Sequence, residues 1–490
     1  MTTNTSRRTP ATVFLELWIY SSAEKTAARV RANAPCPVTH KGARAALAME
    51  ELHEVMARLA ALRDGPEFAA TPLDASFVLM REIDRIFGLV HPREVVVAPT
   101  HGTHAKIPKW LRDLKQSRRE EGQYYASEDF LVIPRGPLRR RARDPNASNT
   151  DSVADRFAYL TLAPKVVFEN GRRVPVRMCV IGTDAAGGSK PGKSPGSEAV
   201  GFVPIAEQPG DVILNCRNEH GQFLVECGTR PDLQCAAHFM QAIERSEPVD
   251  IAIAPELVMP HGHASLLPNL IARSPAKLHA KPRLYVAGSG ATNDKENAQS
   301  WNEGTVLNAA GCVLWTQRKV QQAGINKDRA LQFGLPDPGP GRMVFEDNAS
   351  GDEIVVADVG GMGRCIVLIC QDLEAKPFSG EMLKEFQPDW IFVPILDPEL
   401  RSGGWAHRRA LALSTDSHAR FLVSTSTALT RATGSTGDPC CGLAVGPQAD
   451  VDGDVGRRYA VVSSEHPDSP KLARVKWKSA DTYWRTSTTT

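Results

Sequence analysis

The sequence has no apolar run long enough to cross a membrane. A bilayer-spanning helix needs about 20 consecutive, mostly apolar residues, and no stretch of this chain approaches that length. The first ten residues are polar, carry Arg7 and Arg8, and are not followed by a long apolar stretch with a small-residue cleavage site. We therefore expect a cytoplasmic protein without a signal peptide, and the sequence does not indicate a membrane partner.

The chain also lacks CxxC motifs and a strong charge of one sign. Its 10 cysteines are scattered, only Cys440 and Cys441 are adjacent, and no two of them have the spacing CxxC, which argues against a zinc ribbon or a disulfide framework. The formal net charge of +2 creates no field that would favour nucleic acid. A free thiol persists in a reducing compartment, so one of these cysteines is available for chemistry.

Motifs for cofactors and metals are missing too. The glycine-rich stretch 359–363 is not followed by the lysine and serine of a phosphate-binding loop. The pairs His101/His104 and His261/His263 are too few to form a metal site by themselves and are more typical of polar surface. We expect no cofactor and no metal, although His261 and His263 follow Glu256 closely enough to line a pocket.

The length of 490 residues exceeds one ordinary core and predicts at least two domains. Residues 45–62 and 75–89 have helical composition and spacing, whereas 94–98 and 129–133 are short β-type runs. Arginines 139–141 form a basic cluster in a predicted loop, and 157–182 predicts a hairpin around Asn170-Gly171. The stretch 183–197 is rich in Gly, Ser, Pro and Lys, as linkers are. We place the boundary there, with a mixed α+β region of unknown function over 1–195 and a second domain over 196–490.

The second domain alternates apolar strands with helices. Residues 249–254, 284–288, 364–370, 389–394 and 420–424 are continuous apolar runs, and 233–245 and 406–418 are helical. Strands that are apolar on both faces lie in a sheet covered by helices, so the fold class is α/β. Residues 210–226 look like an insertion of extra β structure.

Three reactive side chains follow predicted strands in this domain. Cys370 ends the segment RCIVLIC, Glu256 follows VDIAIAP, and Lys319 follows CVLWTQR. Each also has an ordinary interpretation: a packed thiol, a solvated loop carboxylate and an exposed lysine. Together they supply a nucleophile, a base for its proton, and a cation for the negative charge that attack on an amide or nitrile carbon creates.

The segments that carry these residues resemble the nitrilase, or carbon–nitrogen hydrolase, superfamily. IAPELVMP is similar to the family's strand and Pro-Glu, WNEGTVLNAAGCVLWTQRK to its hairpin and lysine, and VLICQDLEAKPF to its nucleophile segment. QPDWIFVPIL and WAHRRALALSTDSHARFLVSTSTA follow in the family's order. The resemblance covers roughly residues 198–480.

The resemblance implies an α–β–β–α sandwich in which Glu256 is the general base, Cys370 forms a thioester, and Lys319 stabilises the oxyanion with the backbone N–H of Gln371. It also implies a homo-oligomer and a small-molecule amide or nitrile substrate. The family's second glutamate has its nearest candidate in Asp328. Trp301 and Trp405 are assigned to the core.

The most favoured activity is hydrolysis of a non-peptide carbon–nitrogen bond, and an amide ranks ahead of a nitrile. Two alternatives stay open. One is a nitrilase-like binding or regulatory module, which the long N-terminal region suggests. The other is acyl or ammonia transfer through the same thioester.

Overall fold

The computed structural model describes residues 8–23, 36–92, 107–136, 153–182, 198–296, 299–417, 419–434, 439–449, 455–463, 472–478 and 483–487. Contacts divide the chain into two compact units, Met1–Lys165 with Met178–Val180, and Val166–Arg177 with Ile181–Thr490. The predicted strand at 94–98, His101, His104, arginines 139–141 and the linker 183–197 lie outside the described residues.

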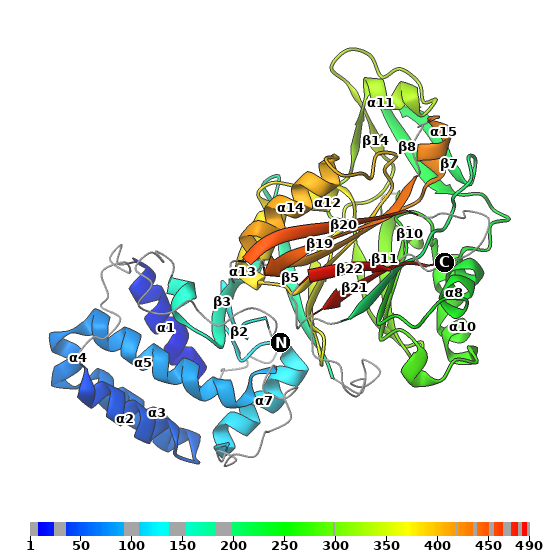
Figure 1. The fold of residues 1–490 in the computed structure, drawn as a ribbon. Helices are drawn as coiled ribbons and strands as arrows, with labels where there is room; N and C mark the ends of the chain where they lie inside the picture. Colours follow the sequence, from blue (N-terminus) through cyan, green and yellow to red (C-terminus); the bar gives the residue numbers. More distant parts are fainter. Residues whose placement is uncertain are drawn as a thin grey trace. The chain divides into compact units, whose positions relative to one another are not determined.

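The first unit combines helices with a small sheet, which agrees with the predicted α+β character (Figure 1). Its helices are α1 (Pro10–Ala23), α2 (Pro37–Leu47), α3 (Leu52–Arg63), α4 (Pro66–Ala70), α5 (Pro72–Phe87) and α7 (Lys109–Glu121). Its antiparallel sheet has the order β1 (Tyr125–Ala126), β2 (Phe130–Pro134) and β3 (Leu160–Pro164).

The helix predicted over 45–62 is interrupted in the structure. α2 ends at Leu47 and α3 begins at Leu52. The turn between them is held by α7, since Trp110 donates its indole N–H to the Leu47 carbonyl at 3.3 Å and its backbone N–H to the Glu50 carbonyl at 3.3 Å. Tertiary hydrogen bonds thus override the helical propensity of this segment.

The predicted hairpin is present as β4 (Val166–Glu169) and β5 (Arg172–Ile181). Asn170 and Gly171 both have positive φ, 46° and 77°, as the two central residues of a type I′ turn require. β5 lies beside β15 in the eight-stranded sheet of the second unit. The contacts therefore assign most of this hairpin to the second unit, although the sequence analysis put the boundary near residue 195.

The second unit is built on two large mixed sheets, which confirms the α/β class (Figure 1). The seven-stranded sheet has the order β12 (Val313–Arg318), β11 (Gln299–Asn308), β10 (Leu284–Glu296), β9 (Ile251–Ile253), β6 (Ala199–Phe202), β21 (Ala473–Lys478) and β22 (Tyr483–Ser487). The eight-stranded sheet has the order β20 (Val455–Ser463), β19 (Cys440–Ala449), β18 (Arg420–Thr425), β17 (Trp390–Ile395), β16 (Gly363–Val367), β15 (Ile354–Val359), β5 and β4.

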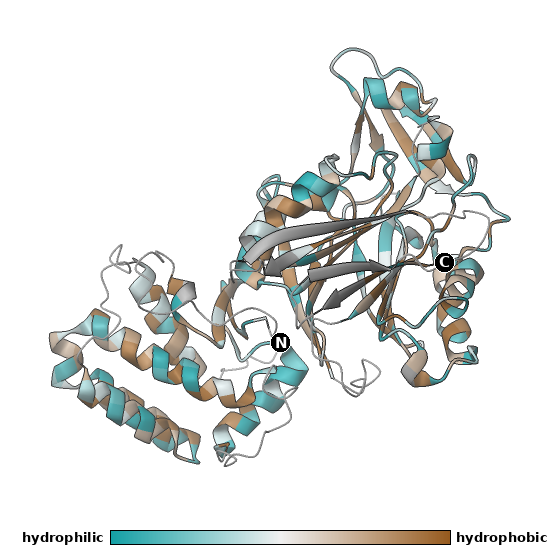
Figure 2. Cartoon of the chain, viewed as in Figure 1, coloured by the Kyte–Doolittle hydropathy of each residue, from teal (hydrophilic) through white to brown (hydrophobic). Residues whose placement is uncertain are grey.

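Parallel strands form the centre of each sheet. β6, β9 and β10 pair in parallel in one sheet, and β16, β17 and β18 in the other. All six residues of β17 and all six of β18 are buried, as the apolar runs predicted. Figure 2 shows apolar residues along these central strands. Parallel strands end at the same edge of their sheet, so residues that follow them collect at one end.

Helices cover the sheets. α8 (Cys235–Glu244) and α10 (Leu267–Arg273) share a hydrophobic cluster with strands β6, β9 and β10. α14 (Trp405–Ser417) packs on β18 and β19, and α12 (Gln371–Glu374) and α13 (Phe378–Phe386) pack on α14. Among the described residues, no helix has both the length and the apolar character needed to cross a membrane.

A third, small sheet stands at one end of this unit (Figure 1). Its four strands have the order β13 (Gly324–Asn326), β14 (Met343–Glu346), β8 (Gln222–Thr229) and β7 (Val212–Glu219), and α11 (Lys327–Gln332) follows β13. The β7–β8 hairpin is the extra β structure expected at 210–226. It pairs through β8 with β14 in parallel, so Val225 lies opposite Glu346.

Candidate active site

Glu256, Lys319 and Cys370 follow three strands and meet at one site. Glu256 lies just after β9, Lys319 directly after β12, and Cys370 shortly after β16. Lys319 Nζ donates to Glu256 Oε1 at 2.8 Å, and the Cys370 thiol lies beside the Glu256 carboxylate, whose pKa it lowers against the effect of burial. The structure therefore brings together the three residues that the sequence analysis selected from separate strands.

A second carboxylate, Glu346, completes the environment of Lys319. Lys319 Nζ lies 2.7 Å from Glu346 Oε1 and 2.6 Å from Glu346 Oε2. The backbone N–H of Ala323 also donates to Glu346 Oε2, at 2.9 Å. Glu346 ends β14 and is buried, whereas Asp328, which the sequence analysis put forward as the second acid, is exposed on α11. The acid that lies beside Lys319 is therefore Glu346 and not Asp328.

Sequence reasoning missed Glu346 because it searched close to Lys319 along the chain. The signal that could have found it is the segment MVFE, an alternating strand that ends in a carboxylate much as IAPE does. Its strand partner, β8, comes from the inserted hairpin more than a hundred residues earlier. That pairing cannot be read from local sequence.

Asn302 on β11 links two of these residues. Its side-chain Nδ2 donates to Glu256 Oε1 at 2.9 Å, and its backbone carbonyl accepts from the Lys319 N–H at 2.8 Å. Asn302 is itself buried, with 2% of its surface exposed. Asn302 therefore orients the carboxylate of Glu256 and holds the backbone of Lys319 in place.

The Cys370 turn has an unusual backbone. Cys370 has φ 49° and ψ −103°, a conformation that costs a non-glycine residue roughly 1–3 kcal/mol. Its N–H donates to the Pro394 carbonyl on β17 at 2.9 Å, which holds the turn against the sheet. Leu257, next to Glu256, also has positive φ, 61°. Strain of this kind at both positions is typical of functional turns.

Asp372 ties the Cys370 turn to the segment after Lys319. Its Oδ2 accepts from the Ile369 N–H at 3.0 Å, and its Oδ1 accepts from Val320 and Gln321 at 3.0 and 2.7 Å. Asp372 is fully buried, and burial raises its pKa to about 7 against the effect of these donors. The two loops are thus joined by one side chain.

Electrostatics at the site favour a neutral thiol beside a base. Burial raises the pKa of Cys370 well above its ordinary value, Glu256 adds to this, and Lys319 opposes it. Burial likewise raises the pKa of Glu256, although Lys319 works against this shift. Burial would lower the pKa of Lys319, but Glu256 and Glu346 together raise it well above the usual range. Lys319 therefore stays an ammonium, and a thiolate forms only as its proton moves to an acceptor.

The site opens into a cavity of about 290 Å³, which we call the main cavity. Glu256, Glu346, Cys370 and Gln371 lie on its wall. The remaining lining residues come largely from the small sheet and the loops beside it: Leu214, Cys227, Leu257, Ala323, Gly324, Ile325, Asn326, Arg329, Phe333, Glu374, Leu396, Asp397, Trp405 and Leu429. Apolar side chains such as Leu214 and Phe333 share this wall with charged ones such as Glu374 and Asp397. A concave site that combines apolar walls with convergent polar groups is typical of small-molecule binding.

Two further predictions concern the aromatic and histidine residues. Trp405 lines the main cavity and donates its indole N–H to Asp397 Oδ2 at 2.7 Å, so it is a wall residue and not only core. Arg329 Nη2 reaches the same oxygen at 2.8 Å. His261 and His263 lie on the short helix α9 (His261–Ala264) and are not among the residues that line the main cavity. Among the described residues, no group of three or more His, Cys, Asp or Glu side chains is placed to hold a metal ion.

No protein-family model matches the sequence, and no curated protein matches it. Solved structures do align with part of it. Nit3 from Saccharomyces cerevisiae, a member of branch 10 of the nitrilase superfamily, aligns over 56% of this chain and 92% of its own at 12% identity, with a TM-score of 0.34. An amidase from Nesterenkonia sp. covers 57% of this chain and 95% of its own at 14% identity, with a TM-score of 0.33. A CN-hydrolase superfamily protein from Xanthomonas campestris covers 58% and 91% at 12% identity, with a TM-score of 0.34.

The chain is thus similar, over slightly more than half of its length, to members of the superfamily that its motifs resemble.

Proposed function

We propose that the second unit is an enzyme that hydrolyses the carbon–nitrogen bond of a small amide through a thioester on Cys370. The observation that carries the proposal is the contact set of Glu256. Its carboxylate accepts from Lys319 Nζ at 2.8 Å and lies beside the Cys370 thiol, which lowers the pKa of the carboxylate. The Glu256 carboxylate, which we propose as the base, therefore lies beside both the proposed nucleophile and the cation at the wall of the main cavity.

The first half of the reaction forms the thioester. Glu256 takes the thiol proton as Cys370 Sγ attacks the amide carbon, because a thiol with a raised pKa needs a base in contact with it. The negative charge that develops on the carbonyl oxygen is stabilised by Lys319 and the backbone N–H of Gln371. When the adduct collapses, the C–N bond breaks, and the nitrogen takes the proton held by Glu256 and leaves as ammonia.

The second half releases the acid. Water enters, Glu256 accepts one of its protons, and the oxygen attacks the thioester carbon. The C–S bond then breaks, the carboxylic acid departs, and the proton returns to the sulfur. Glu346 acts throughout by holding Lys319 through both of its oxygens. No redox step or co-reactant other than water is needed.

The test compares two cysteines that line the same cavity. We expect Cys370→Ala to abolish ammonia release across a panel of small amides, whereas Cys227→Ala, which also removes a thiol from the main cavity, retains it. Activity that survives in Cys370→Ala would overturn the proposal. Loss in both variants with intact folding would show that Cys370 is not the sole thiol required.

Labelling distinguishes an enzyme from a binding module with the same fold. Fluoroacetamide adds its acetamide moiety to the active-site cysteine in a mutant of the amidase from Nesterenkonia sp. AN1. We expect this chain to be labelled at Cys370 before its other cysteines, and peptide mass spectrometry identifies the site. Labelling spread evenly over the exposed cysteines would favour a module without an activated thiol. Assembly into a homo-oligomer stays a prediction, which light scattering would test.

A further inference from the structure

The turn that carries Glu256 lies against a bulge in β10. Between Val286 and Ser289, β10 has one residue more than β11 opposite it, since the register runs from Val286–Val306 to Ser289–Gly304. An extra residue of this kind bends a strand and redirects its side chains, and bulges are frequent beside active sites. The bulge therefore determines how Ser289 faces the turn.

Gly288, inside the bulge, makes the close approach of the turn possible. Its φ of 74° lies in the left-handed region, which glycine adopts without steric cost. A Cβ at this position would collide with the carbonyl oxygen of Pro255, the residue before Glu256. The backbone of the turn thus rests directly on β10, which any larger residue in place of Gly288 would prevent.

Ser289 hydrogen-bonds to this turn through both its backbone and its side chain. It is fully buried, its N–H donates to the Pro255 carbonyl at 3.1 Å, and its carbonyl accepts from the Met259 N–H at 3.0 Å. Its Oγ accepts from the Leu257 N–H at 3.4 Å. These partners lie on both sides of Glu256 in the chain, so a single residue of β10 contacts the turn before and after the carboxylate.

Both peptide planes that flank the Cα of Glu256 are held by these contacts. In the plane before it, the Pro255 carbonyl accepts from Ser289. The Glu256 N–H of the same plane donates to the Ile395 carbonyl, at the end of β17, at 3.3 Å. In the plane after it, the Leu257 N–H donates to Ser289 Oγ. The two planes together fix the direction of the Cα–Cβ bond of Glu256, so these contacts aim its carboxylate.

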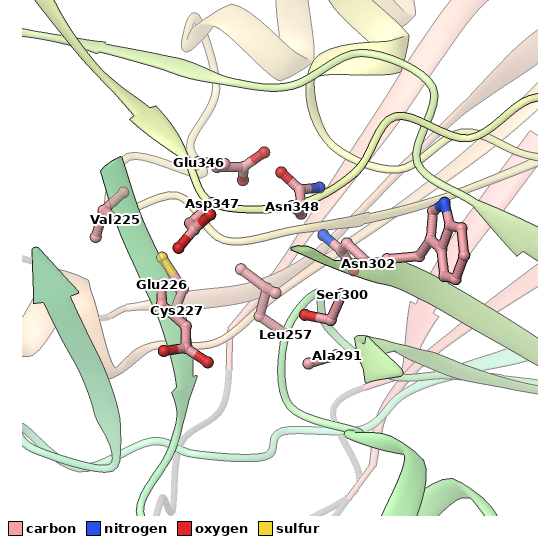
Figure 3. Close-up of a pocket in the computed structure, with 11 residues that line it drawn as sticks. Val225, Glu226, Cys227, Leu257, Ala291, Ser300, Asn302, Glu346, Asp347 and Asn348 are labelled. Carbon is pink, nitrogen blue, oxygen red and sulfur yellow. The ribbon is translucent and has the colours of Figure 1, made fainter. Parts of the chain in front are cut away.

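The conformation of Leu257 shows that this turn needs support. Its φ is 61°, which a bulky residue rarely adopts and which persists only where the surrounding structure holds it. Leu257 also lines the main cavity and a smaller cavity beside it, where Figure 3 shows its side chain together with those of Asn302 and Glu346. The N–H that Ser289 Oγ accepts therefore belongs to a strained segment at the wall of the site.

The end of β17 anchors the nucleophile as well as the base. The Cys370 N–H donates to the Pro394 carbonyl at 2.9 Å, and the Glu256 N–H donates to the next carbonyl, that of Ile395. Both turns are thus tied to the eight-stranded sheet, and Ser289 adds an anchor for the Glu256 turn from the seven-stranded sheet. Loss of the Ser289 hydroxyl would release one side of the Glu256 turn while the Cys370 turn keeps its contact.

We propose that Ser289 is a positioning residue for Glu256, whose hydroxyl holds the strained peptide after Glu256 and thereby keeps the carboxylate beside Cys370. This inference rests on the proposed function, in which that carboxylate takes the thiol proton and passes it on. Ser289 does not touch the reacting atoms in this mechanism. It acts through the backbone of the turn.

Ser289→Ala removes the hydroxyl and leaves the backbone contacts of the turn. A misplacement of about 1 Å in a reacting group can cost about 100-fold in rate, and the hydroxyl is one of several contacts, so we expect kcat for a small amide to fall about tenfold while KM changes by less than about twofold. Ser417→Ala is the matched control. Ser417 is buried, its hydroxyl also accepts a backbone N–H, that of Ala419 at 3.2 Å, and it does not line the main cavity. This variant should keep kcat.

Gly288→Ala tests the same contact without removing the hydroxyl. The added Cβ meets the Pro255 carbonyl and should displace the turn, so we expect kcat to fall about 100-fold. Gly171→Ala is its control, because Gly171 has a similar φ of 77° but a Cβ there would meet nothing within 4 Å. It should share the backbone strain and keep kcat. If Gly288→Ala does not fold, Ser289→Ala still decides.

Crystal structures of the full chain provide a readout that does not depend on turnover. We expect the distance from Lys319 Nζ to Glu256 Oε1, 2.8 Å in the wild type, to lengthen in Ser289→Ala. An unchanged kcat in Ser289→Ala, an equal loss in Ser417→Ala, or a loss of kcat with Glu256 in its original place would each overturn the proposal. If Cys370→Ala keeps activity, the proposed function fails, and the two structures still decide whether Ser289 positions Glu256.

Discussion

Asp372 Oδ1 accepts a hydrogen bond from the backbone N–H of Gln321 at 2.7 Å, so the residue two positions after Cys370 is tied to the residue two positions after Lys319. The same carboxylate also accepts from Val320 and Ile369. Lys319 follows a strand of the seven-stranded sheet and Cys370 one of the eight-stranded sheet, and this buried carboxylate links the two segments. In the mechanism that we propose, Asp372 is a positioning residue, because its contacts are with these backbones and not with the reacting atoms.

Replacing Asp372 by Asn tests this link. An amide keeps one oxygen acceptor but turns an N–H₂ toward a backbone N–H, and an unsatisfied buried donor costs about 1–3 kcal/mol. We expect Asp372→Asn to lower the free energy of unfolding by about that amount and kcat by more than KM changes. Denaturant unfolding and steady-state kinetics measure the two effects. Asp352→Asn, at an exposed position, is the control, and equal behaviour of the two variants would contradict the positioning role.

Substitutions of Glu346 and Asp328 can be compared to test which of the two carboxylates acts together with Lys319. Glu346 contacts Lys319 with both oxygens, whereas Asp328 is exposed. We expect Glu346→Gln to lower kcat about 100-fold, an effect of the size found when one group that stabilises an oxyanion is lost. Asp328→Asn should leave kcat unchanged. The reverse pattern would mean that the contacts of Lys319 do not determine its role.

The pH dependence of activity provides a test in which the direction of the shift is predicted. Asn302 Nδ2 donates to Glu256 and favours the charged carboxylate, so Asn302→Leu should raise the pKa of Glu256. Glu346 is a negative neighbour that raises the pKa of Glu256, so Glu346→Gln should lower it. The base must be ionised to act, and the acid limb of kcat/KM reports its pKa in the free enzyme. The limb is expected to move to higher pH in Asn302→Leu and to lower pH in Glu346→Gln.

A control for these shifts is Glu303→Gln, the next residue along β11, whose carboxylate pairs with Arg318 and not with the site. Its acid limb should coincide with that of the wild type. Movement of both variants in one direction would show that the limb does not report Glu256.

The sequence alone was sufficient for much of the central fold. Continuous apolar runs predicted β9, β17 and β18, since a strand buried on both faces leaves that pattern. The sequence was insufficient where the structure of a segment depends on residues that are distant in the chain. The hairpin β4–β5 was recognised from its turn, but β15, its neighbour in the sheet, lies far along the chain. The break between α2 and α3 depends on hydrogen bonds from α7.

The site shows the same division. Glu256, Lys319 and Cys370, which the structure brings together, could be selected because each follows a recognisable strand and belongs to a motif. Asn302 lies within the motif that contains Lys319, but the sequence assigned it no role. Its contact with Glu256 joins two strands whose register cannot be read from the local sequence. Glu346 could not be chosen by proximity to Lys319, because β14 is placed by the inserted hairpin.

That hairpin also predicts substrate selectivity. Leu214 on β7 lies opposite Cys227 on β8, and both line the main cavity. Because side chains alternate along a strand, Asn215 points away and is exposed. Leu214→Ala should enlarge the acyl side of the cavity. A methylene in an apolar pocket is worth about 1–3 kcal/mol in discrimination, so we expect the ratio of kcat/KM for bulky over small acyl amides to rise about tenfold or more, with Asn215→Ala unchanged. If the ratio stays constant in Leu214→Ala, the acyl group does not bind against Leu214. The only remaining role of the hairpin would then be to position β14 and Glu346.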